Sequence, residues 1–407
     1  MKKNVAYILV FILLFFSGNP LNIVFGKYAY IIATVATLIL IKFKIRNQKE
    51  FYLIFGKVLI FLMLIFIGQY FVLGFISWIG AFNFILKVFM GAIIVNQLQS
   101  HFVSILFKVV VKLTLFSLFA YFLINIFSLP FIGYKIDSEQ MSYFIYTISS
   151  THQKQNDGMF WEPGAFAGIL TLTLVLNFES ITYLWKNNRS SILILLMGIL
   201  TTQSTTGYII TFTIFIFKFL KFKNKYVSTG IIFLFVSLGT YLYENTNFLK
   251  EKIDHQFDQT KIQDKTQYSN TRFGSVLFDW HYINKHPIVG NGFHESTRYA
   301  DHAHLQQMAK LGENLGSGNG FSNFLASMGI PFMFGYFALI FLNFKKNGLM
   351  YSIIVVIILL LILQGEQWLN YPIFLSIPFI LLKDRDSMRY NRISNNTNGS
   401  VIKHKYP

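Results

Sequence analysis

Apolar stretches long enough to form helices recur along the chain, and no polar domain separates them. The cores of four such stretches are 5–16, 53–67, 230–242 and 349–363. A helix that crosses the hydrocarbon core of a bilayer needs about 20 mostly apolar residues. The composition agrees, since 54% of the 407 residues are hydrophobic and 13% are charged, against about 25% charged residues in soluble domains. We therefore predict an all-α integral membrane protein.

The basic residues orient the predicted helices. About twelve spans can be drawn, two of them at 163–184 and 320–343, and nearly every even-numbered span ends on a basic cluster. Such clusters stay on the cytoplasmic side, which places both termini in the cytoplasm. The first apolar stretch lacks a good cleavage site and is expected to remain as a helix. We predict one polytopic domain over 1–386, with large extracytoplasmic loops at about 129–161 and 245–320, and a disordered cytoplasmic tail over 387–407.

The charge and the histidines exclude two other classes of protein. The net charge of +17 is concentrated in short loops between helices, so it follows the positive-inside rule and does not indicate nucleic-acid binding. The chain has no cysteine, which excludes disulfides and thiolate metal sites. His294, Glu295, Asp301, His302 and His304 have ligand chemistry, but their spacing fits no common zinc site. We predict no metal and no cofactor.

The second large loop carries a predicted amphipathic helix. Apolar residues recur at helical spacing from Asn270 until Pro287 stops the pattern. Arg272 and His286 fall on the opposite, polar face. The helix either only covers the bundle or presents Arg272 to a phosphate or diphosphate at the outer membrane boundary. The Gly-Asn-Gly turn at 290–292 is expected to let backbone amides approach a ligand.

A further set of residues surrounds the predicted start of a helix at Pro163. Proline suits the first helical position, so Glu162 falls at the N-cap. Glu162 either caps the helix or presents a carboxylate that orients a sugar hydroxyl or accepts its proton. His286 is the alternative proton acceptor, because histidine titrates near neutral pH.

Two polar features interrupt the apolar stretches. The run 201–207, Thr-Thr-Gln-Ser-Thr-Thr-Gly, separates two short apolar segments and is expected to dip into the outer half of the bundle beside a wet cavity. Lys87 lies mid-span, where an unpaired charge costs roughly 2.5 to 3.5 kcal/mol. It is expected either to face a cavity or to pair with Glu366.

Taken in order, these motifs resemble those of one family over nearly the whole chain, namely the O-antigen polymerase (Wzy-type) and O-antigen ligase superfamily. The resemblance rests on the run Phe-Trp-Glu-Pro-Gly-Ala-Phe-Ala at 160–167, the polar break at 201–207, Arg272 followed by Trp280 and 286–292, and Gly-Asn-Gly-Phe-Ser-Asn-Phe-Leu at 318–325.

The resemblance implies a metal-independent, extracytoplasmic glycosyltransferase in the bacterial cytoplasmic membrane. Polymerases of this type move the growing glycan from its undecaprenyl-diphosphate carrier onto the next lipid-linked repeat unit, and make O-antigen, capsule or exopolysaccharide. Their expected partners are this lipid-linked oligosaccharide, membrane lipid and a chain-length regulator protein. By the same resemblance Arg272 would neutralise the departing diphosphate, with Glu162 or His286 as the base. Residues expected to bind the sugars are Lys285, Arg298, His302, His304 and Asn319.

Two departures from the family pattern bear on the reaction. Ligases usually have a histidine directly before the asparagine, where this chain has Gly318 before Asn319, and this favours a polymerase. An arginine often found shortly before the Glu-Pro-Gly run is absent, and Lys154 and Asn156 stand nearby. The alternative within the superfamily is a ligase that transfers glycan to lipid A core or protein. A flippase or permease would also be polytopic, but its charges are expected inside the helices.

Overall fold

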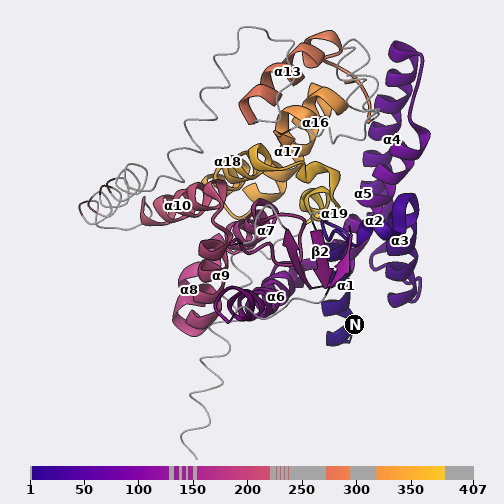
Figure 1. The fold of residues 1–407 in the computed structure, drawn as a ribbon. Helices are drawn as coiled ribbons and strands as arrows, with labels where there is room; N and C mark the ends of the chain where they lie inside the picture. Colours follow the sequence, from indigo (N-terminus) through magenta and orange to yellow (C-terminus); the bar gives the residue numbers. More distant parts are fainter. Residues whose placement is uncertain are drawn as a thin grey trace, which may run out of the picture.

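The computed structural model describes residues 2–127, 133–136, 140–143, 145–149, 154–220, 272–293 and 318–380, together with positions 226, 230, 233 and 237. These residues are mostly helical (Figure 1). Three helices are long and apolar enough to cross a membrane, and two pairs of bent helices pass the same test together, which gives three to five candidate spans. The helical part of the prediction is confirmed, and about twelve spans remain a prediction.

The elements fall into two groups along the chain. Before the first large loop lie α1 (Lys3–Phe15), α2 (Asn22–Phe25), η1 (Gly26–Tyr28), α3 (Ala29–Leu40), α4 (Gln48–Leu73), α5 (Trp78–Leu98), η2 (Gln99–His101) and α6 (Phe102–Asn125). After it lie α7 (Pro163–Leu176), η4 (Phe178–Ser180), α8 (Ile181–Asn187), α9 (Arg189–Thr202), α10 (Thr205–Leu220), α13 (Arg272–Lys285), α16 (Gly320–Met328), α17 (Ile330–Lys345), α18 (Leu349–Gly365), η6 (Trp368–Asn370), α19 (Pro372–Ser376) and η7 (Ile377–Phe379).

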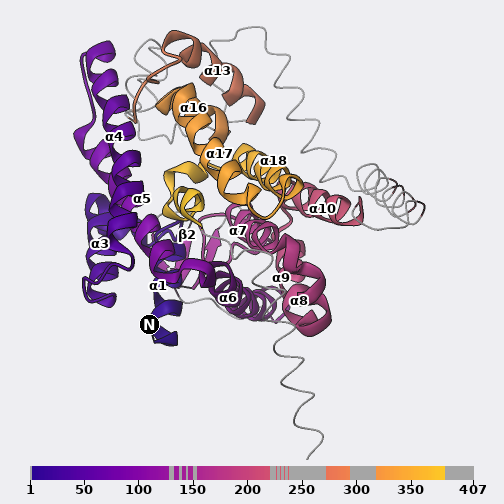
Figure 2. The same cartoon turned by 180° about the vertical axis from the view of Figure 1, so that it is seen from behind.

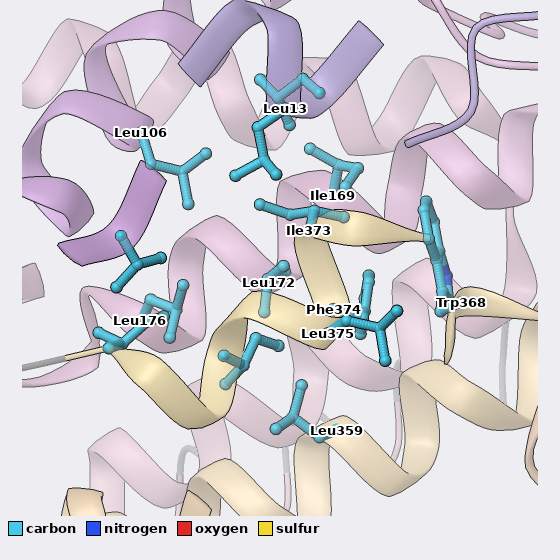
Figure 3. Close-up of a cluster of buried hydrophobic side chains, with 14 of the residues drawn as sticks. Leu13, Leu106, Ile169, Leu172, Leu176, Leu359, Trp368, Ile373, Phe374 and Leu375 are labelled. Atoms are coloured by element: carbon cyan, nitrogen blue, oxygen red, sulfur yellow. The ribbon is translucent and has the colours of Figure 1, made fainter. Parts of the chain in front are cut away.

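Helix α7 lies at the centre of the bundle (Figure 1). It is apolar on every side, so all its faces must be covered, and α6, α9, α10 and α18 pack against it. Figure 3 shows Leu172 and Leu176 of α7 in one apolar cluster with Leu106 of α6 and Leu359 of α18. The neighbouring helices approach closely where residues are small, since a Cβ on Gly207 would lie 2.8 Å from the Ala167 Cβ. This packing fixes the start of α7, where Glu162 lies.

Two helices that the sequence predicts as continuous are bent. The predicted helix 163–184 breaks after Leu176 by 65°, and the predicted helix 320–343 bends by 118° between α16 and α17. Gly329 causes the second bend, because its φ of +81° is left-handed and a proline follows at the second position of α17. As a result α16 turns back to pack against α13.

Two hydrogen bonds fasten α4 to this end of the molecule, where α13 and α16 lie together (Figure 2). Gln69 of α4 donates from Nε2 to the carbonyl oxygens of Val289 (2.7 Å) and Ser327 (2.9 Å). The Ile330 amide donates to the Pro287 carbonyl over 2.8 Å. The segment that follows α13 is therefore held between α4 and the α16–α17 bend.

The first large loop contains a small antiparallel sheet, which the all-α prediction did not include. Its strands β1 (Tyr134–Lys135), β2 (Gln140–Tyr143) and β3 (Tyr146–Ser149) follow one another in space in chain order. The Thr147 amide of β3 donates to the Gly158 carbonyl over 2.7 Å. The sheet therefore supports the segment that leads into α7.

The turn after α1 holds two distant segments together. The Trp161 amide donates to the Gly18 carbonyl over 3.1 Å, and Asn19 Nδ2 donates to the Met159 carbonyl over 2.8 Å. On its other side the Ser17 hydroxyl accepts a hydrogen bond from the Ile373 amide at 2.9 Å. The turn thus joins the segment before α7 to the start of α19.

Lys87 of α5 is half-buried and forms no ion pair with an acidic side chain among the residues that the structure describes. Its Nζ lies 4.5 Å from the centroid of the Tyr30 ring, which is cation–π geometry. No ion pair joins Lys87 to Glu366, so that predicted pairing is wrong.

Candidate functional site

Glu162 occupies the N-cap position of α7, as the sequence predicts, but its side chain does not cap the helix. The backbone there is extended, with φ −159° and ψ 162°, Pro163 follows at the first helical position, and the side chain accepts no hydrogen bond from the helix amides. The side chain instead pairs with Glu366. The alternative of a simple acidic cap is therefore wrong.

Glu366 is the partner of Glu162 and directly follows the last residue of α18. It is surrounded by protein and keeps part of its surface open. Its carboxyl lies near enough to the carboxyl of Glu162 for a hydrogen bond, and such a bond needs a proton on one of the two groups. Burial raises the pKa of Glu366 well above its usual value, and the charge of Glu162 and the bond to it raise it further, while Arg272 and the side chain of Trp161 act in the opposite direction.

A glycine leaves room for this carboxyl pair. A Cβ on Gly164 would lie 3.0 Å from Oε1 of Glu366 and 3.2 Å from Oε1 of Glu162. Both oxygens therefore lie close to the Gly164 backbone in the first turn of α7. A side chain at this position would press on both carboxyl groups.

Arg272 supplies the positive charge of the site. It is the first residue of α13, and its Nη1 donates to Oγ1 of Thr206 over 2.5 Å. Thr206 lies in the first turn of α10 and belongs to the polar break 201–207 of the sequence. The guanidinium is near enough to Glu366 to oppose the rise of its pKa. Residues from α7, α10, α13 and the end of α18 therefore meet at one place.

Asp157 is a third acidic side chain of the site and is 1% exposed. Burial raises its pKa well above the usual value, the charge of Glu162 raises it further, and the backbone amide of Ser149 opposes this rise. The neighbouring Asn156 fixes the segment, because its side chain bonds Ser117 (2.5 Å) and Thr201 (3.0 Å). Asn156 was noted in the sequence only as standing near the missing arginine.

A small cavity of about 10 Å³, with room for about one water molecule, adjoins these groups. Arg272, Thr206 and Glu366 line it together with Gly164 and Trp368, and apolar residues of α10 and α18 complete its wall. Trp368 is fully buried, and its indole Nε1 finds no acceptor among the residues that the structure describes. Figure 3 shows the Trp368 ring at the edge of the apolar cluster of the core. The cavity thus combines a cation, a carboxyl group, a hydroxyl and an N–H donor that lacks an acceptor among the described residues, with apolar walls.

The other predicted site residues lie elsewhere. Lys285 and His286 are at the opposite end of α13 from Arg272, about 20 Å away at 1.5 Å per residue. Burial and then Lys285 lower the pKa of His286, which keeps its ring neutral, but the structure does not bring it to Arg272. Arg298, His302 and His304 lie outside the described residues, so their placement stays a prediction.

Asn319 is used within the fold. Its Oδ1 accepts from the Ser322 amide (3.0 Å) as the N-cap of α16, and its Nδ2 donates to Oε1 of Gln364 (2.6 Å). It is 2% exposed. Asn319 therefore ties α16 to the end of α18, two residues before Glu366, and its role in sugar binding stays a prediction.

The amides of the turn 290–292 are not available to a ligand. The amide of Gly290 donates to His286, that of Asn291 to Ala326 (2.7 Å), and that of Gly292 to Ser327 (3.0 Å). The last two bonds satisfy carbonyl groups at the end of α16, which lack partners within their own helix. The expected ligand contact there is wrong.

Sequence reasoning missed Glu366, Asp157, Thr206 and Trp368 as members of the site. A signal existed for Glu366, because it is a lone acidic residue between apolar stretches near the predicted outer end of a helix. Among the described residues no group of three or more histidine, aspartate or glutamate side chains is arranged to hold a metal ion. The sequence matches no protein-family model and no curated protein.

Proposed function

We propose that this protein is a polysaccharide repeat-unit polymerase of the bacterial cytoplasmic membrane. It transfers a glycan from an undecaprenyl-diphosphate carrier to the next lipid-linked repeat unit. The observation that carries the proposal is the guanidinium of Arg272 beside the carboxyl pair of Glu162 and Glu366 at the edge of a cavity. The resemblance of the sequence motifs to the O-antigen polymerase superfamily supports the same reaction, and three to five candidate spans suit a membrane-bound carrier.

The proposed reaction needs two kinds of group. The acceptor hydroxyl attacks the anomeric carbon of the donor sugar, the bond from that carbon to the diphosphate oxygen breaks, and its electron pair leaves on the diphosphate. The hydroxyl proton passes to Glu162. Arg272 balances the charge that grows on the leaving diphosphate, and charge stabilisation of this kind is usually the largest contribution to catalysis. A planar guanidinium suits two phosphate oxygens at once.

The test uses purified protein in liposomes with undecaprenyl-diphosphate-linked repeat units taken from a strain that lacks this protein. The wild type is expected to lengthen them into a ladder on a gel, and Arg272→Ala is expected to lower the rate roughly 100-fold or more. Arg189→Ala is the matched control, because Arg189 also begins a helix but packs over Trp185. Normal chain length with Arg272→Ala would contradict the assigned role of Arg272.

The same strain separates the alternative functions. Loss of a polymerase leaves single lipid-linked repeat units on the outer face of the membrane, whereas loss of a flippase leaves them on the inner face. Loss of a ligase leaves long lipid-linked chains that have not reached their final acceptor. Single units on the inner face, or long unattached chains, would overturn the proposal.

A further inference from the structure

The contacts of Glu366 define what its carboxyl can do. Arg272 brings a positive charge near this carboxyl, and the Trp161 side chain can donate a hydrogen bond to it. The carboxylate of Glu162 can only accept a hydrogen bond unless it is protonated. A protonated Glu366 therefore satisfies all three neighbours, because one oxygen accepts and the hydroxyl donates to Glu162. An ionised Glu366 would place two negative charges in contact beside Gly164.

A second observation is a buried donor without an acceptor beside Glu366. The indole N–H of Trp368 has no acceptor among the described residues, although the ring is fully buried. A buried donor without an acceptor costs free energy. Its Nε1 lies 2.8 Å from the position of a Cβ on Gly168, and both residues line the cavity with Glu366. A water molecule or a single oxygen of a bound sugar that reaches into the cavity would supply the missing acceptor.

We infer that Glu366 is a positioning residue, whose carboxyl donates a hydrogen bond to Glu162 and holds that carboxylate toward the acceptor hydroxyl. The inference rests on the proposed transfer reaction and adds a role for a residue that the sequence did not assign to the site. Before the reaction the pair holds one proton, on Glu366. The acceptor hydroxyl gives a second proton to Glu162 as its oxygen bonds to the anomeric carbon, and the diphosphate departs with the electron pair of the broken bond. The pair returns its extra proton to water.

The charged and titratable groups around Glu366 set the pH dependence. They are Glu162 before α7, Arg272 of α13, Asp157 near Glu162, and Tyr371 before α19. Burial raises the pKa of Tyr371, and Tyr30 and then the two glutamates raise it further. Because the pKa of Glu366 is raised, the donor is present below that pKa and is lost as the pH rises through it. Transfer is therefore expected to decline on the alkaline side.

A glutamine at position 366 tests this role directly. Arg272 and Trp161 both favour the amide oxygen, which leaves the amide nitrogen to donate to Glu162 at every pH. Glu366→Gln is expected to keep transfer within about threefold of the wild type and to remove the alkaline decline, whereas Glu366→Ala is expected to lose roughly 10- to 100-fold in kcat. Glu162→Gln is expected to lose roughly 100- to 10,000-fold, as for a missing general base.

Three outcomes are decisive. If Glu366→Gln loses as much as Glu162→Gln, Glu366 itself takes the proton and the inference is overturned. If Glu366→Gln keeps the alkaline decline, another group causes it and the inference is again overturned. An infrared titration of each purified protein follows the protonated carboxyl band without any substrate. This band should lose the contribution of Glu366 in Glu366→Gln, while that of Asp157 remains. If the wild type shows the band but lengthens no lipid-linked units, the proposed function is overturned, whereas the protonation of Glu366 is still supported.

Discussion

Arg272 of α13 donates a hydrogen bond to the hydroxyl of Thr206 in α10, and this bond is the direct link between the cation and the polar break of the sequence. Removing the acceptor should let the guanidinium move and weaken its hold on the diphosphate. Thr206→Val is therefore expected to raise KM for the lipid-linked donor roughly tenfold, since a hydrogen bond to a charged group contributes about 1.5–3 kcal/mol. Thr206→Ser should stay near the wild type. Thr213→Val is the control on the same helix, because its hydroxyl bonds only the Ile209 carbonyl in its own helix.

Gly164→Ala should separate stability from activity. Alanine favours helix over glycine by about 1 kcal/mol, but its Cβ would press on both carboxyl oxygens at 3.0 and 3.2 Å. We expect the melting temperature to be unchanged or slightly higher while the transfer rate falls at least tenfold, as when a general base is misplaced. Gly56→Ala in α4 is the control, because nothing lies within 4 Å of a Cβ there. Equal activity of Gly164→Ala and Gly56→Ala would show that the spacing of the carboxyl pair is unimportant.

The raised pKa of Glu366 also predicts how stability varies with pH. The carboxyl of Glu366 holds its proton more tightly in the folded state than in the unfolded chain. Its contribution to the free energy of unfolding is therefore fully present below the usual carboxyl pKa and is lost as the pH rises through the raised pKa. The slope is at most about 1.4 kcal/mol per pH unit for one proton. Thermal unfolding of the detergent-purified protein should therefore shift to lower temperature from mildly acidic to alkaline pH, with a smaller shift for Glu366→Gln. Parallel curves for the two proteins would contradict the prediction.

Asn156→Ala should loosen the segment that carries Asp157 and Glu162. The Asn156 side chain is fully buried and bonds Ser117, Thr201 and the Gly158 amide. Losing these bonds should lower the free energy of unfolding by about 2–3 kcal/mol, because buried partners remain unsatisfied. Chemical unfolding in mixed micelles measures the change. Asn187→Ala, which removes one exposed bond to the Tyr183 carbonyl, should change stability by less than about 0.5 kcal/mol.

The sequence predicted the parts of this molecule that depend on local pattern. Helical spacing located α13, and Pro163 located the start of α7 and thus Glu162. Charge and residue type identified Arg272 as the cation of the site. Each of these predictions uses only residues that are close together in the sequence, and helix propensity and hydrophobic periodicity are properties of such residues.

Contacts between distant segments could not be predicted in this way. The pairing of Glu366 with Glu162 depends on how α18 ends beside α7, and the sequence instead suggested Lys87, which lies under the ring of Tyr30. Histidine content drew attention to His286, but the length of α13 keeps it away from Arg272. The bend at Gly329 was missed because an apolar run reads as one helix unless the tertiary position of its glycine is known.

The turn after α1 has a mechanical consequence. Ser17 and Gly18 bond two segments that carry the carboxyl pair, because Trp161 directly precedes Glu162 and Ile373 lies farther along the segment that begins with Glu366. A displacement of α1 would therefore be passed to the residues before α7 and to the start of α19 together.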